Sequence, residues 1–184
     1  MSSLRADFDE LCERIRHRRE LSHASFEPIY YLVFPPRSIL EVKRETPAWK
    51  AKLHQEGWDV HQFSILEHLW DLLRQDPFWP IWVAQDEKST ADWKKTNDAL
   101  GTRATSENGL LKRLERKLND LHGKKNALLI VTDLEALHPF LRIGSIESKL
   151  QGSFYVPTIF LYPGMRTGKS GLKFLGFYPE DGNY

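Results

Sequence analysis

The glycine-rich stretch near the end of the chain is the segment most suggestive of chemistry. Residues Gly164 to Ser170 read GMRTGKS and resemble a phosphate-binding loop. Such a loop reads Gly, four residues, then Gly-Lys-Ser or Gly-Lys-Thr, and its backbone N–H groups hold phosphates at the start of a helix. Here three residues separate Gly164 from Gly168, and the following residues 171–177 have the apolar composition of a strand. Without a following helix there is no helix dipole, so we interpret the stretch as a turn between two strands.

An acidic residue after an apolar run is the second candidate. Asp133 follows residues 127–132 (ALLIVT), a pattern similar to the strand whose acid holds magnesium in nucleotide hydrolases. An aspartate in this position is also a common helix cap or turn residue. We favour the structural role, and keep as an alternative a degenerate nucleotide-binding protein that uses Lys169 and Asp133.

The histidines and the single cysteine form no recognisable catalytic or metal-binding pattern. The seven histidines lack the His-Glu-x-x-His spacing, and Cys12 alone cannot provide a thiolate zinc site. The Gly-x-Ser-x-Gly motif of hydrolases is also absent from the sequence. The sequence therefore predicts a protein that is not an enzyme and that uses no metal ion or cofactor.

The charge of the chain is balanced. It has 26 lysines and arginines against 25 aspartates and glutamates, for a net charge of +1. Basic residues cluster at 14–19 and at 112–125, but a balanced chain has no general attraction for a polyanion. A DNA-binding accessory protein is therefore a second, disfavoured alternative. With one cysteine, no apparent secretion signal and no long apolar run, the sequence predicts a cytoplasmic protein without a membrane span.

The order of apolar runs and helical periodicities predicts one α/β domain over residues 1–184. Strands separated by helices indicate right-handed crossovers, and hence three layers with a mostly parallel sheet of about five strands and helices on both faces. This arrangement is similar to a degenerate nucleotide-hydrolase-like or a Rossmann-like core. No helix separates the last two strands, so an antiparallel last strand fits the pattern. The predicted strands are 28–34, 58–63, 127–131, 156–161 and 172–177, and the predicted helices are 3–22, 46–57 (with Thr46 as cap), 65–75 (with Ser64 as cap), 110–121 and 145–150.

The segment 76–108 interrupts this pattern as an insertion. We expect it to be irregular and aromatic around Phe78, Trp79 and Trp82, and to form one short helix or a mobile loop from residue 89 onward. Aromatic residues on rigid loops are favoured anchors at protein interfaces. They can instead fold back as a small satellite core, and the sequence leaves both interpretations open.

The last third of the chain resembles the BrxB family of BREX systems. The matching features, in chain order, are the apolar strand at 127–131, Pro139 to Arg142, Val156-Pro157, Tyr162-Pro163-Gly164, the strand LKFLGF at 172–177 and Asn183-Tyr184. The N-terminal half fits more loosely. Members of the family usually continue beyond the position of Asn183 and Tyr184, where this chain ends.

The resemblance implies a role in phage defence without catalytic activity. It implies an adaptor or regulatory subunit whose direct partner is PglZ, an alkaline-phosphatase-like protein, within a complex that includes the methyltransferase PglX and the ATPase BrxC. The family motif offers no catalytic residues to carry over. We predict that partner contacts involve Phe78, Trp79, Trp82, Arg142, Arg166 and Lys169.

Overall fold

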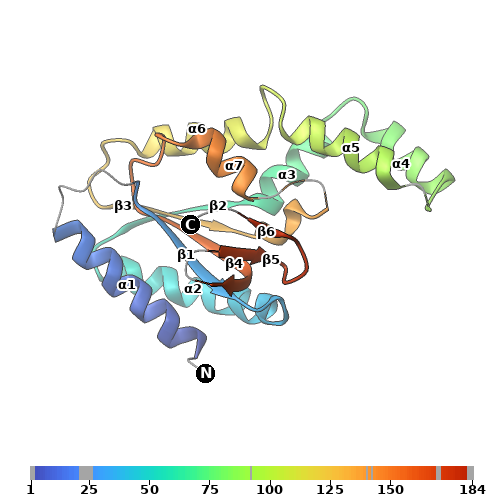
Figure 1. Ribbon diagram of the computed structural model, residues 1–184. Coiled ribbons are helices and arrows are strands. Elements are labelled where there is room, and N and C mark those ends of the chain that lie inside the picture. The colour runs from blue at the N-terminus through green and yellow to red at the C-terminus, as the bar shows by residue number, and fades with distance from the viewer. Residues whose placement is uncertain are drawn as a thin grey trace.

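The computed structural model describes residues 3–20, 27–91, 93–139, 141, 143–168 and 171–181. Helices and strands alternate along much of the chain, as Figure 1 shows. The elements are α1 (Leu4–Glu20), β1 (Ile29–Phe34), the 3-10 helix η1 (Pro36–Ser38), α2 (Ile39–Gln55), β2 (Asp59–Ser64), α3 (Ile65–Arg74), α4 (Trp79–Lys88), α5 (Trp93–Ala104), α6 (Leu110–Leu121), β3 (Ala127–Thr132), the 3-10 helix η2 (Leu134–Leu137), α7 (Ile143–Leu150), β4 (Thr158–Thr167), β5 (Gly171–Phe174) and β6 (Glu180–Asp181).

The sheet is mostly parallel, as predicted. β2 pairs with β3, β3 pairs with β4, and β4 pairs on its other side with β1, all in parallel. The second half of β4 then pairs with β5 in an antiparallel hairpin, and β5 pairs with the short strand β6. The prediction of an antiparallel last strand is therefore confirmed for β5, whereas β6 was not anticipated.

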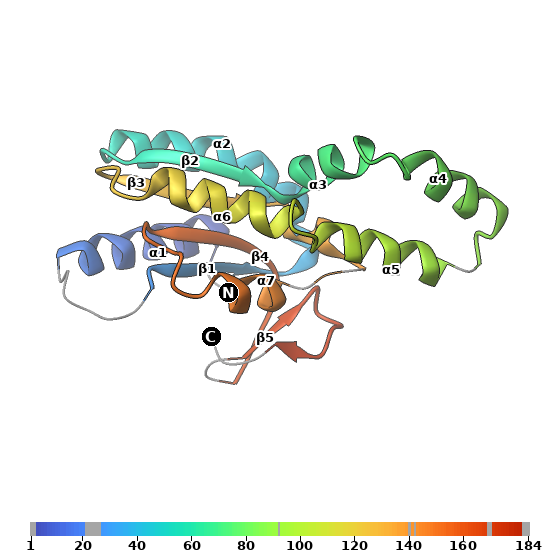
Figure 2. The same ribbon diagram turned by 90° about the horizontal axis from the view of Figure 1, so that it is seen from above.

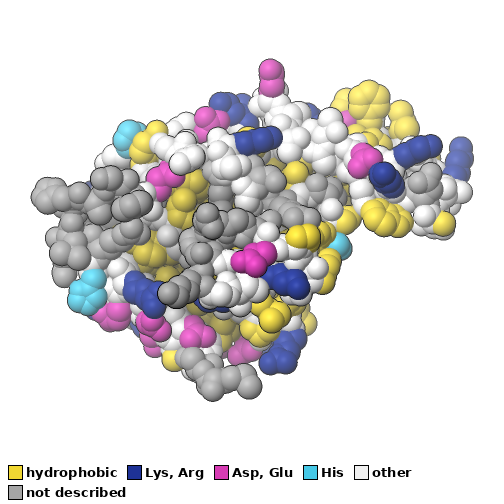
Figure 3. Space-filling view, viewed as in Figure 1, with side chains coloured by type: hydrophobic (Ala, Val, Ile, Leu, Met, Phe, Trp, Pro, Cys, Tyr) yellow, Lys and Arg dark blue, Asp and Glu magenta, His cyan; other side chains and the backbone are white. Residues whose placement is uncertain are grey.

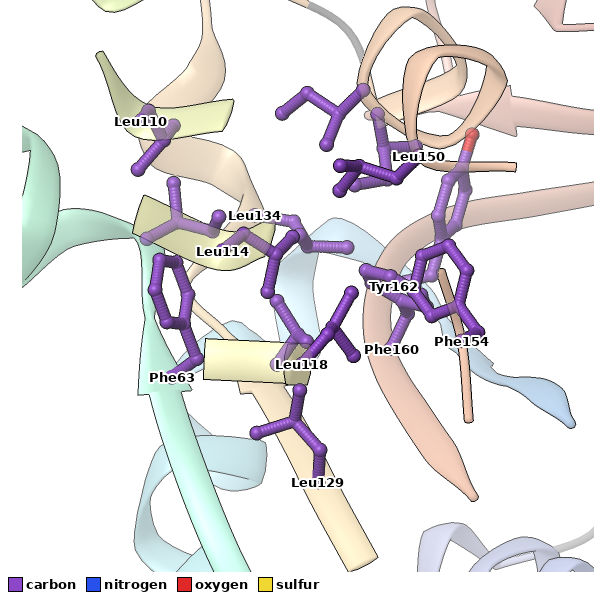
Figure 4. Close-up of a cluster of buried hydrophobic side chains, with 14 of the residues drawn as sticks. Phe63, Leu110, Leu114, Leu118, Leu129, Leu134, Leu150, Phe154, Phe160 and Tyr162 are labelled. Atoms are coloured by element: carbon purple, nitrogen blue, oxygen red, sulfur yellow. The ribbon is translucent and has the colours of Figure 1, made fainter. Parts of the chain in front are cut away.

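Helices cover both faces of the sheet (Figure 1). On one face, α1 and α2 pack against alternate residues of the strands, including Leu128, Ile130 and Ile159. On the other face, α6 and α7 pack against the intervening residues of the strands, including Leu129 and Phe160. Figure 4 shows this second core, with leucines of α6 directed at Phe63 and Leu129. The predicted three-layer architecture is thus confirmed.

Helix α2 begins earlier than the sequence indicated. Thr46 was expected to cap it, but the helix starts at Ile39 and Pro47 lies inside it. The hydroxyl of Thr46 donates to the carbonyl of Val42 at 2.7 Å. A proline inside a helix removes one backbone hydrogen bond. Here the buried stripe of Val42, Trp49 and Leu53 continues across Pro47, so packing against the sheet outweighs the loss.

Two helices occupy most of the predicted insertion 76–108. α4 and α5, with the residues that join α3 to α4, form what we call the arm (residues 75–104), which extends away from the sheet in Figures 1 and 2. The aromatic stretch 78–82 was expected to be irregular, but it forms the N-cap and the first turn of α4. Pro80 lies in that first turn, where a missing N–H costs nothing because no helical partner exists for it. Of the two alternatives expected from residue 89 onward, a short helix or a mobile loop, the structure has the helix, α5.

Candidate functional site

A network of hydrogen bonds surrounds Asp133 at the carboxyl ends of β2 and β3. Asp133 has a left-handed backbone conformation, with φ 62°. Its Oδ2 accepts from the hydroxyls of Ser64 and Thr132, each at 2.7 Å, and its Oδ1 lies 2.8 Å from Nζ of Lys43. Ser64 also caps α3, as predicted, by accepting from the N–H of Glu67. Asp133 therefore joins three elements and is already neutralised by a lysine.

The surroundings of Asp133 keep it ionised. Burial alone raises the pKa of its carboxyl, but hydrogen bonds from Lys43, Ser64 and Thr132 outweigh burial and hold the pKa below its ordinary value. Lys43 also lies 2.7 Å from a carboxylate oxygen of Glu135. An open groove of about 550 Å³ between α2 and the sheet borders this network. A metal ion at Asp133 would have to displace Lys43, and the described residues contain no group of three potential metal ligands.

Replacing Asp133 by asparagine tests whether the residue has this structural role. We expect Asp133→Asn to lower the free energy of unfolding by about 1–2 kcal/mol at pH 7, because the charged hydrogen bonds are lost. Asparagine tolerates the left-handed conformation, so backbone strain does not confound the result. The pKa of Asp133 is lower in the folded chain than in the unfolded chain, where it is about 3.9. Its ionised carboxylate therefore stabilises the protein at pH values above about 3.9, and this stabilisation is lost as the pH falls below that value.

Urea unfolding of the unmodified chain and of Asp133→Asn at pH 7 and at pH 3 measures the difference in their free energies of unfolding. This difference should be smaller at pH 3. The matched change of the exposed Asp86 to asparagine should have no effect at either pH. Equal stability of Asp133→Asn and the unmodified chain at pH 7 would contradict the structural role.

The glycine-rich stretch lies in the β4–β5 hairpin. Residues Gly164 to Thr167 pair with Phe174 to Gly171 in antiparallel register, so the first part of the stretch, which was predicted to be a turn, extends strand β4. A Cβ atom on Gly164 would lie 2.4 Å from the carbonyl oxygen of Lys173. The close approach of two strands therefore accounts for this glycine. Lys169 lies outside the described residues, and the junction between β1 and α2 reads Pro-Pro-Arg-Ser, without the glycines of a phosphate-binding loop.

The thiol of Cys12 is buried among the side chains of α1, α2 and the sheet. Burial, with a smaller contribution from the charge of Glu56, raises the pKa of this thiol to about 12. Only the thiolate is a nucleophile. We therefore expect the native protein to show no reaction with an aromatic disulfide reagent at pH 8, and one thiol per chain to react after unfolding in urea.

The same raised pKa also makes stability depend on pH. In the unfolded chain the thiol ionises near pH 8.5, whereas in the folded chain it ionises only near pH 12. The contribution to stability is complete below the unfolded pKa and is lost as the pH rises between the two values. Rapid reaction of the native thiol at pH 8 would contradict this account of Cys12.

Three residues of the basic clusters noted in the sequence pair with acids. Arg14 lies 2.5 Å from Glu10, and Arg16 lies 3.0 Å from Glu13. In the second cluster, Lys112 pairs with Glu115 at 2.6 Å. Surfaces with alternating charge release few counterions from DNA. The structure therefore gives little support to the DNA-binding alternative.

The arm presents a surface unlike the rest of the molecule. α4 begins Trp-Pro-Ile-Trp-Val, yet none of its described residues is fully buried. Phe78 is 60% exposed and Ile81 is 58% exposed. A helical stretch as apolar as Trp-Pro-Ile-Trp-Val is normally buried. Figure 3 shows apolar side chains gathered on the arm, beyond the body of the protein.

The two tryptophans of α4 pack into a small satellite core and are not fully exposed. Trp79 and Trp82 are partly buried against the buried residues Leu69, Leu73 and Ala104. The indole of Trp79 also meets the edge of Trp70, with ring centroids 5.5 Å apart. Large exposed apolar side chains on α3 and at the start of α4 include Leu66, Trp70, Phe78 and Ile81. Sequence reasoning missed Leu66, Trp70 and Ile81, although Leu66 and Trp70 are four residues apart on one helix and so share a face.

The structure does not gather all the predicted contact residues in one place. Phe78, Trp79 and Trp82 lie together at the start of α4. Arg166 lies on β4 and lines a separate groove of about 510 Å³ with residues of α1 and β1. Arg142, like Lys169, lies outside the described residues. The arm is therefore the candidate site on which the described predictions converge.

Comparison with known proteins supports a place in phage defence. The model of the family described as BREX protein BrxB matches residues 61–184, which is more than half of the chain and includes the arm and the β4–β5 hairpin. No curated protein and no solved structure matches the chain. Among the described residues, no helix is both long and apolar enough to cross a lipid bilayer. The chain belongs to the BrxB family, and so to the components of BREX phage-defence systems.

Proposed function

We propose that this chain is a non-catalytic adaptor subunit of a cytoplasmic BREX complex, and that it binds PglZ through the arm. In the wider assembly it would stand beside PglX and BrxC. The family match supports membership of the system, and the resemblance in the last third of the sequence suggests PglZ as the direct partner.

The apolar helix α4 without a fully buried residue is the observation that carries the proposal. Removing a large apolar side chain from water contributes about 1.5–3 kcal/mol. Leaving Phe78 and Ile81 more than half exposed forgoes that contribution in the isolated chain. Exposed apolar patches of this kind mark protein-binding surfaces in soluble proteins, and aromatic residues are enriched in them.

The chemistry near Asp133 favours an adaptor over an enzyme. The carboxylate of Asp133 is held by Lys43, Ser64 and Thr132, so both of its oxygens already have partners within the protein. A degenerate nucleotide-binding protein would need both a phosphate loop and a free acid. The glycine-rich stretch provides a strand hairpin instead.

Pairwise chromatography with mass detection tests the proposal. The chain is mixed in turn with PglZ, PglX and BrxC, each at about 10 µM, a concentration at which a standard-sized interface is normally occupied. We expect a complex with PglZ whose mass corresponds to a whole number of copies of each of the two proteins. Separate elution of the two proteins at this concentration would contradict the proposal, as would turnover of any substrate by the isolated chain.

A further inference from the structure

The turn between α3 and α4 is tied to the end of α5 by a buried acid. Asp76 is 7% exposed, and its Oδ1 accepts from the backbone N–H of Phe78 at 2.9 Å. Its Oδ2 forms an ion pair with Nε of Arg103, in the last turn of α5. Arg103 is held in turn by a hydrogen bond of 3.0 Å from its Nη1 to the hydroxyl of Ser106. One side chain therefore fixes the start of α4 and joins it to the last turn of α5, at the base of the arm.

Apolar packing between the arm and α3 is too limited to define the position of α4 by itself. The buried residues of this cluster are Leu69, Leu73 and Ala104, with Trp79, Trp82, Leu100 and Leu141 partly buried around them. Apolar contacts are not directional, so a small cluster allows several packings of similar energy. The carboxylate of Asp76 restricts the geometry further, because it is buried and must replace its lost hydration with Arg103 and the N–H of Phe78.

Resting on the proposed function, we propose that the Asp76–Arg103 pair positions α4 on α5, and that the partner binds only the arm in this arrangement. The pair also positions Phe78 and Ile81 at the start of α4, because Asp76 accepts from the N–H of Phe78. Without the pair, α4 samples other positions relative to α5. The apparent affinity for the partner then falls in proportion to the fraction of molecules whose arm is correctly placed.

A positioning residue and a contact residue have different effects on binding kinetics. Loss of positioning lowers the association rate, because fewer molecules are competent, and leaves the dissociation rate of the formed complex nearly unchanged. Loss of a contact mainly raises the dissociation rate. The kinetics therefore distinguish Asp76, which is buried, from Ile81, which is exposed.

Two measurements on the Asp76→Asn variant test the inference. Asparagine keeps the shape of the side chain and can still accept from the N–H of Phe78. In hydrogen exchange without a partner, the amides of α4 should exchange about 10-fold faster than in the unmodified chain, while those of β3 and β4 should not change. In surface binding to PglZ, association should slow by about 10-fold with less than about a 2-fold change in dissociation.

The controls separate this inference from the proposed function. Arg103→Lys keeps the charge and should give intermediate values, and Asp120→Asn on the exposed surface of α6, outside the arm, should match the unmodified chain. Unchanged exchange of α4 in Asp76→Asn overturns the inference, as does faster exchange with a normal association rate. A normal affinity of an Ile81→Asp variant would instead remove the proposed function, and the exchange measurement does not depend on that outcome.

Discussion

An Ile81→Asp variant is expected to bind PglZ about 100-fold more weakly than the unmodified chain, which corresponds to about 2.7 kcal/mol. Ile81 is 58% exposed on α4, so the change costs the folded chain little. In the complex, an aspartate at this position would be removed from water without a partner for its charge, and the apolar contact would be lost. Changes of this size are typical of central residues in protein interfaces.

A matched change elsewhere on the surface provides the control for Ile81→Asp. Leu40 is 72% exposed in the first turn of α2, outside the arm. Leu40→Asp introduces the same charge in place of a side chain of the same size, and we expect it to bind PglZ with unchanged affinity. Calorimetric titration of the three proteins measures the difference. Equal affinities for Ile81→Asp and Leu40→Asp would show that the arm is not the binding surface.

Truncation of Phe160 is expected to have the largest effect on stability. Its ring is fully buried in the middle of β4, between β1 and β3. It stacks on Tyr31 at 5.5 Å and meets the edge of Phe154 at 6.0 Å. Phe160→Ala should lower the free energy of unfolding by about 3–5 kcal/mol, because it removes apolar contact and leaves a cavity. That loss is a large part of the total stability of an ordinary domain.

Phe177 allows the same substitution on the surface, since its side chain is 62% exposed. We expect Phe177→Ala to lose less than about 1 kcal/mol in urea unfolding. Phe160→Leu, with a smaller loss of volume, should lie between the two and remains measurable if the alanine variant does not fold. A loss below about 1 kcal/mol for Phe160→Ala would contradict the described packing around β4.

The parallel strands were predictable because burial on both faces requires apolar residues at nearly every position. β3 is buried at all six of its positions, and its sequence is a continuous apolar run. The prediction failed where packing outweighed a local signal. Pro47 suggested the start of a helix, but the buried stripe from Val42 to Leu53 extends α2 across it.

The candidate site was less accessible to sequence reasoning because contacts between distant residues define it. Asp133 was singled out from its place after a strand, but Lys43 and Ser64, which neutralise and bind it, lie far away in the sequence. The aromatic residues of α4 were identified by composition. Their division into the half-buried Trp79 and Trp82 and the exposed Phe78 depends on which face meets Leu69 and Leu73, and no local pattern defines that face.

Hydrogen exchange of this chain with and without PglZ tests most directly whether the arm is the binding surface. We predict that saturating PglZ slows exchange of the amides of α4, residues 79–88, and of the neighbouring end of α3, because docking removes them from water and from local opening. Exchange in α1 and α2, on the opposite face of the sheet from α6 and α7, should stay the same. Protection confined to α1 and α2, or no protection at saturation, would contradict the account.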